Sequence, residues 1–270
     1  MCIEILRRIK EYCKKYDVAL KYLVDVISDL KVIPMIRGKS FEYSVSDRLR
    51  AILSNSWEVK NLNINAQPGN HDIDVSVIRK TDKKEIRIEC KLTKNNSFRL
   101  KKDHAELRVK CMRSRTFSDN AAAARMARHY GVSKEFLLVH ADSYREGDFD
   151  YVITSLGNSM WTTIEDKYTF NGNREQFNYL NKLFPDHFTD FDKFQEQAFN
   201  FLLFAKSSDL IVSPKNKLVC TRRKCILVNS QNDCGFIPNY PIVNLTEVAK
   251  GTSSWKRIGI IEDCFNNFLA

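Results

Sequence analysis

The stretch from Gly69 to Lys94 constrains the fold of this chain more than any other, because it holds two alternating patterns in succession. Apolar residues occupy every second position of 73–77 and again of 86–92. A period of two is typical of a strand that is buried on one face only. The sequence Thr-Asp-Lys-Lys at 81–84 is polar and supplies a turn between the two runs. The stretch therefore predicts an antiparallel hairpin.

The polar positions of this hairpin carry a chemically useful set of side chains. Pairing of the two strands would bring Asp74 onto the same face as Glu89 and Lys91, beside a cleft. Two neighbouring carboxylates repel each other, and a divalent cation relieves that repulsion. Hard oxygen ligands favour Mg²⁺. An ammonium group two residues after Glu89 would lie on the same side of its strand, where it can position a water for attack on phosphorus. The alternative is a solvent-facing side of the strand that happens to carry these residues.

The order Asp74, fourteen intervening residues, then Glu89-Cys90-Lys91 resembles the D…ExK form of the PD-(D/E)XK nuclease signature, as found in type II restriction endonucleases and Holliday-junction resolvases. The resemblance implies an α/β (α+β) fold with a restriction-endonuclease-like core. In that core a helix is followed by an antiparallel meander, then by a helix and a further strand, so that a central mixed β-sheet is flanked by helices. It implies Mg²⁺ held by Asp74, Glu89 and the carbonyl of Cys90. It also implies that Lys91 assists hydrolysis of double-stranded DNA to a 5′-phosphate and a 3′-hydroxyl.

This sequence departs from the family pattern at the first motif position, since the literal Pro-Asp pair is missing. Pro68 lies upstream, and Asp72 competes with Asp74 for the role of metal ligand because both point to the same face. We favour Asp74, because the hydrophobic strand at 75–78 follows it directly.

A carboxylate on the preceding helix completes the predicted catalytic set. Val45, Leu49 and Ile52 repeat at helical spacing, and Glu42 falls on the same apolar stripe. A carboxylate on the buried side is costly unless a partner or a metal compensates it. In the PD-(D/E)XK family a glutamate of the first core helix often reaches the metal site, and Glu42 matches that role. The alternative is a carboxylate near the helix start, stabilised by the helix dipole.

The charge of the chain favours a polyanionic partner. It carries 43 Lys and Arg against 33 Asp and Glu, a net charge of +10. The excess concentrates in residues 91–128, directly after the proposed metal site, and a second basic run stands at 221–224. Arginine pairs bidentately with guanine, so Arg222 and Arg223 are candidates for reading bases, unless the run is simply a charged hairpin tip. The predicted DNA-binding residues are Lys94, Arg99, Lys101, Lys102, Arg113, Arg115, Arg222 and Arg223.

The eight cysteines are too few for a disulfide scaffold in 270 residues. Neither a secretory leader nor an apolar run of membrane-spanning length is visible, so we expect a cytoplasmic protein with reduced thiols. Cys220, Cys225 and Cys234 raise the alternative of a zinc site. Four residues separate the first pair and no fourth ligand follows nearby, so buried core thiols are the favoured interpretation.

Three regions are expected along the chain. Residues 1–34 predict a helical cap or a dimer contact, residues 35–155 the nuclease core, and residues 156–270 an elaboration for DNA recognition or dimerisation. Short apolar runs predict strands at 136–140, at 151–154 and within 209–229, and an aromatic stripe predicts a helix over 191–203.

The leading hypothesis is a Mg²⁺-dependent restriction endonuclease acting as a homodimer, because a palindromic site calls for a symmetric protein. One alternative is a structure-directed repair or recombination nuclease of the same fold. The other is a basic DNA-binding protein without enzymatic activity.

Overall fold

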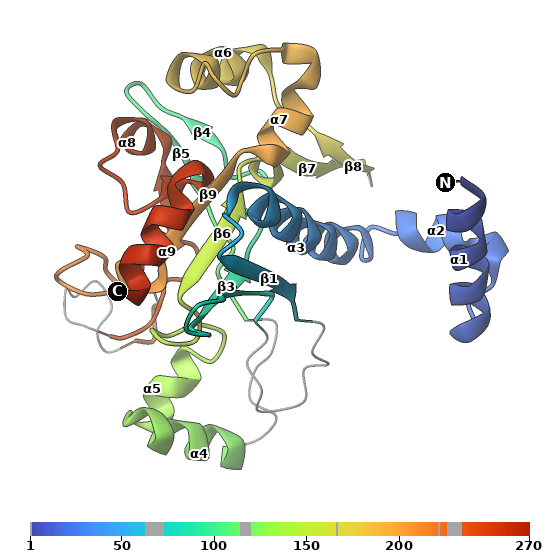
Figure 1. Cartoon of the computed structure of the whole chain (residues 1–270). Coiled ribbons are helices and arrows are strands. Elements are labelled where there is room, and N and C mark those ends of the chain that lie inside the picture. Colours follow the sequence, from blue (N-terminus) through green and yellow to red (C-terminus); the bar gives the residue numbers. More distant parts are fainter. Residues whose placement is uncertain (1, 63–72, 114–119, 166, 221, 226–233) are drawn as a thin grey trace.

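A computed structural model describes residues 2–62, 73–113, 120–165, 167–220, 222–225 and 234–270 (Figure 1). The α-helices are α1 (Cys2–Lys15), α2 (Leu23–Ser28), α3 (Ile33–Ile52), α4 (Asn120–Tyr130), α5 (Lys134–Val139), α6 (Arg174–Leu183), α7 (Phe194–Asn200), α8 (Leu245–Lys250) and α9 (Ile261–Leu269). The strands are β1 (Trp57–Asn61), β2 (Val75–Arg79), β3 (Glu85–Cys90), β4 (Arg99–Leu100), β5 (Ala105–Arg108), β6 (Tyr151–Ser155), β7 (Trp161–Ile164), β8 (Lys167–Phe170), β9 (Leu202–Lys206), β10 (Ile242–Asn244) and β11 (Lys256–Arg257). Short 3₁₀ turns include η1 (Leu20–Tyr22), η2 (Gly157–Met160), η3 (Phe191–Lys193), η4 (Ser207–Asp209) and η5 (Ile258–Ile260).

The centre of the molecule is a six-stranded mixed sheet in the order β1-β2-β3-β6-β9-β11. Strands β1, β2 and β3 form the predicted antiparallel meander. Strand β6 lies parallel to β3, and β9 and β11 continue the sheet in antiparallel fashion. Because β9 and β11 come from the region after residue 155, the predicted boundary at that position falls within one continuous sheet.

Each face of the sheet is covered by its own set of helices. Helices α3 and α9 pack on one face, where Phe41, Val45 and Phe265 join the alternate residues of β2, β3 and β6 in one buried cluster. Helices α6, α7 and α8 pack on the other face, together with the small sheet β10-β5-β4. Because helices cover both faces, the central strands β6 and β9 are almost wholly buried.

The predicted hairpin is confirmed, whereas two predictions from short apolar runs were wrong and one predicted helix is shorter than expected. Residues 136–139 belong to α5 and not to a strand, and His140 follows as the C-cap, because Ser133 caps a helix by accepting a hydrogen bond from the Phe136 amide at 3.1 Å. The helix expected over 191–203 ends at Asn200, and the last residues of that range form β9. The described part of 209–229 holds turns, with Ser213 accepting from the Asn216 amide, and not the expected β segment.

A third, smaller hydrophobic cluster lies away from the central sheet. It joins Ala127 of α4 and Leu137 of α5 to residues between Val212 and Phe236. Ala127 of α4 thus packs into this cluster and not on the central sheet. Gly131 follows α4 with φ +64°, the left-handed conformation that glycine readily adopts at the end of a helix.

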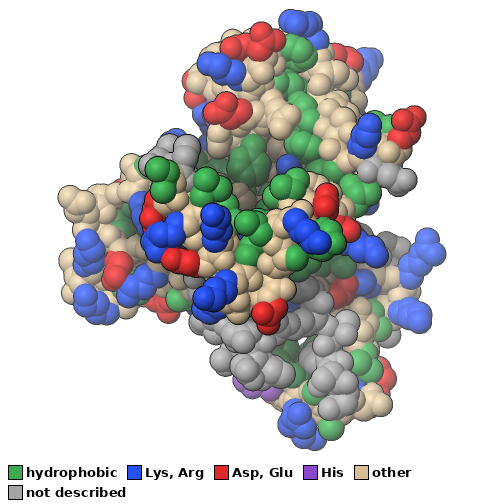
Figure 2. Space-filling model, turned by 90° about the vertical axis from the view of Figure 1, so that its right-hand side faces the viewer, with side chains coloured by type: hydrophobic (Ala, Val, Ile, Leu, Met, Phe, Trp, Pro, Cys, Tyr) green, Lys and Arg blue, Asp and Glu red, His purple; other side chains and the backbone are tan. Residues whose placement is uncertain are grey.

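The N-terminal helices α1 and α2 stand out from the body at one end of α3 (Figure 1). Many of their apolar side chains are exposed, including Ile3 at 85% and Val24 at 68%. Figure 2 views the molecule from this side, where hydrophobic side chains alternate with Lys and Arg at the surface. In the ranges that the structure describes, no helix has the length and apolar character needed to cross a bilayer.

Two glycines give matched tests of this packing. A Cβ atom on Gly157 would lie 2.8 Å from the backbone of Phe199, because η2 packs directly on α7. We expect Gly157→Ala to lower the free energy of unfolding by about 1–3 kcal/mol, since backbone atoms must move. A Cβ on Gly38, inside α3, meets nothing within 4 Å. Gly38→Ala should therefore stabilise the protein by about 0.5–1 kcal/mol. Chemical denaturation of both variants measures the contrast, and equal effects would contradict the packing described.

Candidate active site

The register of the central hairpin fixes the geometry of the predicted site. Val75 pairs with Ile88 in an antiparallel register. Asp74 precedes Val75 and Glu89 follows Ile88, so the same register places Asp74 opposite Glu89. Opposite residues of an antiparallel pair share a face, as the sequence pattern predicted. Asp74 is anchored twice, because its carbonyl accepts from the Leu62 amide at 3.3 Å and its Oδ2 accepts from the Cys90 amide at 2.7 Å.

Glu89 is the most deeply buried acid of the site, with only 3% of the residue exposed. Its Oε1 lies 2.6 Å from Lys91 Nζ and accepts a hydrogen bond from the Tyr144 hydroxyl at 2.7 Å. The Lys91 ammonium also lies 5.3 Å from the centre of the Tyr144 ring. Although burial opposes it, the Glu89 carboxylate raises the pKa of Lys91 well above its usual value, so this lysine is a cation and not a base.

The Asp74 carboxyl sits in an unfavourable place for a negative charge. Burial, reinforced by the nearby carboxylates of Glu89 and Glu42, raises its pKa from 3.8 to about 8, against the opposing effect of Lys91. The group therefore holds a proton at neutral pH unless a cation joins it. Crowding of buried acids in this way is typical of sites that bind a metal or perform acid–base chemistry.

Glu42 reaches the edge of the site from α3, with 16% of its side chain exposed. It forms an ion pair with Lys39 three residues earlier on the same helix. The Asp74 carboxylate also contributes to raising the pKa of Lys39, so this ammonium lies within electrostatic reach of the site. The first turns of α3 are themselves held, because the Arg37 guanidinium lies 4.3 Å from the ring centre of Trp161 and donates to Asn158.

Asp74 and Glu89 are the two residues best placed to hold Mg²⁺. Among the described residues, no donor hydrogen-bonds to Asp74 Oδ1 or Glu89 Oε2, so each acid offers one oxygen to a cation. Mg²⁺ commonly takes only one or two carboxylates and fills its other positions with water and phosphate. In the described chain, the oxygens of Glu42, Asp74 and Glu89 do not all come within 4.8 Å of one another. Glu42 lies near enough for its charge to help raise the pKa of Asp74, behind the larger effects of burial and Glu89, while the competing Asp72 lies outside the described residues.

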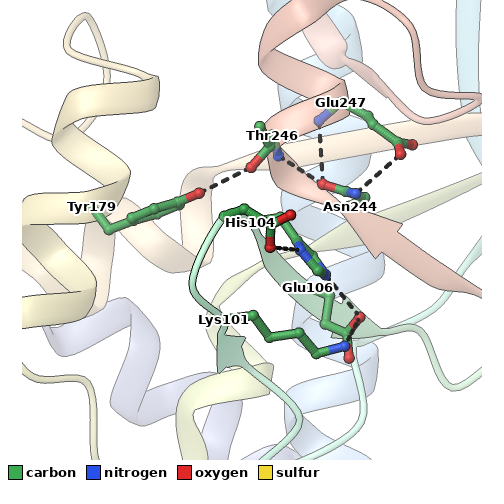
Figure 3. Close-up of polar contacts among 8 residues, drawn as sticks. Lys101, His104, Glu106, Tyr179, Asn244, Thr246 and Glu247 are labelled. Carbon is green, nitrogen blue, oxygen red and sulfur yellow. Dashed lines mark hydrogen bonds and ion pairs between the residues drawn. The ribbon is translucent and has the colours of Figure 1, made fainter.

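The predicted DNA-binding residues after β3 fall into two groups. Lys94, Arg99 and Lys102 are exposed. Lys101 is paired with Glu106 at 2.9 Å, and Figure 3 shows Lys101 and His104 both pointing toward that carboxylate. In the same view, Tyr179 of α6 reaches Thr246 of α8 beside strands β4 and β5, with a 3.0 Å contact between the hydroxyl oxygens.

The remaining predicted basic residues are also divided. Arg113 forms an ion pair with the buried Asp148, and its guanidinium lies 5.1 Å from the centre of the Tyr144 ring. It is engaged inside the protein and supports the loop that carries Tyr144. Arg222 is paired with Asp142, whereas Arg223 is exposed. Arg115 lies outside the described residues.

Two residues of the site were not found from the sequence. Tyr144 comes from the irregular loop between α5 and β6, and no motif marks it. Its position depends on a contact with Glu89 across 55 residues of chain. Lys39 had a local signal, since it lies three residues before Glu42 on one helix, and such pairs face each other.

The raised pKa of Asp74 makes a prediction for the metal-free protein. The folded state holds the Asp74 proton up to pH about 8, whereas the unfolded chain releases it near 3.8. Protons therefore stabilise the fold, and this contribution is lost as pH rises from about 4 to about 8. Relative to Asp74→Asn, the wild-type protein should lose stability on the order of a few kcal/mol between pH 5 and 8 in EDTA.

Asp82 supplies the matched control, because Arg79 lowers its pKa to about 2 in the exposed turn of the same hairpin. Both its folded and unfolded pKa values lie below pH 5, so the difference between wild type and Asp82→Asn should stay flat from pH 5 to 8. Denaturation curves at each pH measure both differences, and a flat result for Asp74→Asn would show that Asp74 is ionised in the folded protein.

Comparison of the chain with protein-family models, with curated proteins and with solved structures finds no match. What the site does is therefore inferred from its own side chains: two acids, a buried lysine and a tyrosine where β2 begins and β3 ends.

Proposed function

We propose that this chain is a Mg²⁺-dependent DNA endonuclease of the PD-(D/E)XK type, resembling a type II restriction enzyme. The observation that carries the proposal is the meeting of Asp74, Glu89 and Lys91 on one face of the β2–β3 hairpin. These residues follow the D…ExK order. The motif specifies only their identity and spacing along the chain, so their meeting in space is a separate observation. The agreement between a sequence pattern and an independent geometry is what raises the proposal above the motif alone.

The order of elements around the site supports the same family. Helix α3 precedes the antiparallel meander β1-β2-β3, and β6 returns parallel to β3, as a restriction-endonuclease-like core requires. One difference is that α4 and α5, which link β3 to β6, pack into the third cluster and not against the sheet.

The side chains divide the chemistry between them. Asp74 and Glu89 would hold Mg²⁺ through their remaining oxygens, with the Cys90 carbonyl as a further ligand. When bound, Mg²⁺ supplies positive charge that polarises the scissile phosphate and lowers the pKa of water. Lys91 is kept as a cation beside Glu89, where it orients the attacking water and stabilises negative charge that develops on the phosphate. Tyr144 holds the Glu89 carboxylate in place by its hydrogen bond.

The proposed substrate is double-stranded DNA, contacted by exposed cations around the site. Lys94, Arg99, Lys102 and Arg223 are exposed and available for phosphate or base contacts. Neutralisation of phosphates by such residues releases counterions, so affinity falls steeply with salt.

We further propose that the active form is a homodimer joined through α1 and α2. Apolar side chains such as Ile3, Leu6 and Val24 are exposed on these helices. Isolated helices of this length are marginally stable in water, so they gain most from packing against a partner. A two-fold dimer would present two active sites to the two strands of a palindromic sequence.

Substitution of the site tests the nuclease activity directly. With plasmid DNA and Mg²⁺, Asp74→Ala, Glu89→Ala and Lys91→Ala should each lower the cleavage rate by at least about 10²-fold, because each removes charge that the transition state needs. Tyr144→Phe should cost about 10- to 100-fold, since it frees the Glu89 carboxylate. Asp82→Ala removes an exposed acid of the same hairpin and should cleave at the wild-type rate.

The outcomes also separate the alternative functions. Discrete plasmid fragments support a restriction enzyme, whereas a strong preference for branched DNA identifies a structure-directed repair nuclease of the same fold. A wild-type protein that binds DNA in a salt-sensitive manner, without Mg²⁺-dependent cleavage, would be a non-enzymatic binding protein and would end the proposal.

The proposed dimer is tested by charge placed on the exposed helices. The double variant Leu6→Asp and Val24→Asp should sediment as a monomer at concentrations where the wild type is a dimer, because each carboxylate would be buried in the interface. Ile260 is exposed to a similar degree, 49%, but lies before α9. Ile260→Asp should leave the dimer intact, and a monomeric wild type would exclude the interface.

A further inference from the structure

A second cluster of chemically reactive side chains lies outside the carboxylate site. His140, Cys220 and Cys234 are all buried, and one ligand atom from each lies within 4.8 Å of the other two. The His140 Nε2 atom is 3.4 Å from the Cys220 sulfur. Cys225 is buried in the same hydrophobic cluster, and its thiol hydrogen-bonds to that of Cys220. Three thiols and an imidazole therefore meet in one small region.

The histidine is oriented as a metal ligand would be. Its Nδ1 atom lies 3.0 Å from the carbonyl oxygen of Phe136, and a carbonyl only accepts hydrogen bonds, so Nδ1 carries the proton. The lone pair of Nε2 then points toward the cysteine sulfurs. The ring is stacked on Phe236 at 4.4 Å between centres and 7° between planes, which fixes its direction. Metal-binding histidines usually donate their second N–H to a carbonyl or carboxylate in this way.

Both polar and apolar groups surround the cluster. The backbone amide of Arg222 donates a hydrogen bond to the Cys220 sulfur. The buried apolar neighbours include Leu137, Val212 and Phe236, and the buried Ser143 lines the same pocket. Soft sulfur ligands with one imidazole suit Zn²⁺, whereas the oxygen ligands of the carboxylate site suit Mg²⁺. The two clusters therefore differ in the metal they would select.

We propose that His140, Cys220, Cys225 and Cys234 form a structural Zn²⁺ site of the Cys₃His type. Zn–S distances are about 2.3 Å and Zn–N distances about 2.0–2.1 Å, so ligands on one tetrahedral zinc lie roughly 3.5–4 Å apart. The ligand atoms of His140, Cys220 and Cys234 lie within 4.8 Å of one another and reach that spacing with small side-chain movements. Cys225, whose thiol hydrogen-bonds to that of Cys220, would move in as the fourth ligand. Binding converts three thiols to thiolates and releases three protons, so the complete site carries one net negative charge. Four protein ligands leave no position open, which makes the zinc structural.

The segment from Val212 to Phe236 explains why the site is needed. Its described residues form turns with little regular secondary structure, and the cluster that holds them to α4 and α5 is small. Three of the seven buried residues in that cluster are the cysteines themselves. Thiols alone give little hydrophobic stabilisation, whereas a bound zinc ties the segment to the end of α5 through His140. Arg222 and Arg223 lie on this segment, between two of the ligands. The proposal does not depend on the nuclease activity.

Metal content of the untagged full-length protein tests the proposal. We expect about one Zn²⁺ per chain by elemental mass spectrometry. A mercurial reagent, which binds cysteine sulfur, should release this zinc. Cys220→Ser, Cys234→Ser and His140→Ala should each lower zinc content to less than about one tenth at micromolar free zinc. Cys264→Ser is the matched control, because Cys264 lies on α9 in another hydrophobic cluster. It should keep full zinc content.

Cobalt substitution of the wild-type protein keeps the test decisive if a variant fails to fold. Co²⁺ should give the d–d bands of tetrahedral coordination and thiolate charge-transfer bands, and Cys225→Ser should lower the charge-transfer intensity by about one third, from three thiolates to two. Chelation of zinc from the wild type should lower Tm by about 10 °C or more. A wild-type protein without stoichiometric zinc, or a cobalt form without thiolate bands, overturns the proposal. An unchanged cobalt spectrum in Cys225→Ser overturns the assignment of the fourth ligand.

Discussion

The pairing register of β2 with β3 is the constraint on which the candidate active site depends. The alternate residues Val75, Val77, Ile86 and Ile88 are fully buried under α3 and α9, and they pair with one another across the hairpin. A slip of one residue would turn these side chains to the other face and expose the apolar set, so the register is strongly specified. The same alternation leaves Asp74 and Glu89 opposite each other on the second face. Hydrophobic packing on one side of the sheet thus sets the distance between charges on the other.

That arrangement buries two carboxyl groups, which disfavours their ionised forms. The surrounding residues offset only part of this free-energy cost. Glu89 has both a cation and a hydroxyl donor on one oxygen, which compensates its burial. Asp74 has a single backbone donor and takes up a proton instead. A divalent cation would satisfy both acids at once and would release that proton. The site would consequently be more stable with a bound cation than alone, as is typical of binding sites built from buried charge.

Structural features that depend on neighbouring residues could be predicted from the sequence, whereas features that depend on distant residues could not. The hairpin and the helix that carries Glu42 depend on residues close in sequence, and both were predicted. Residues 136–140 were assigned to a strand because a short apolar run has no distinguishing period, and the Ser133 cap decided for a helix. Tyr144 could not be found, since its contact with Glu89 links a motif to an irregular loop. The meeting of His140 with the cysteines could not be predicted for the same reason, because His140 precedes Cys220 by 80 residues.

The two clusters are joined by one stretch of chain, and this gives the loop between α5 and β6 a defined role. His140 caps α5 at one end of the loop, and Tyr144 meets Glu89 only four residues later. Asp142 and Asp148, which lie on either side of Tyr144, bind Arg222 and Arg113 respectively. The loop forms backbone turns and one isolated bridge, between Arg145 and Phe236, and no strand of its own. Its conformation therefore depends strongly on these side chains and on long-range contacts such as the Ile237 amide, which donates to the Tyr144 carbonyl at 2.8 Å. A metal at the cysteine cluster would fix the first residue of the loop and the segment that carries Arg222. The position of Tyr144, and through it the orientation of Glu89, would then depend on a site built from entirely different ligands.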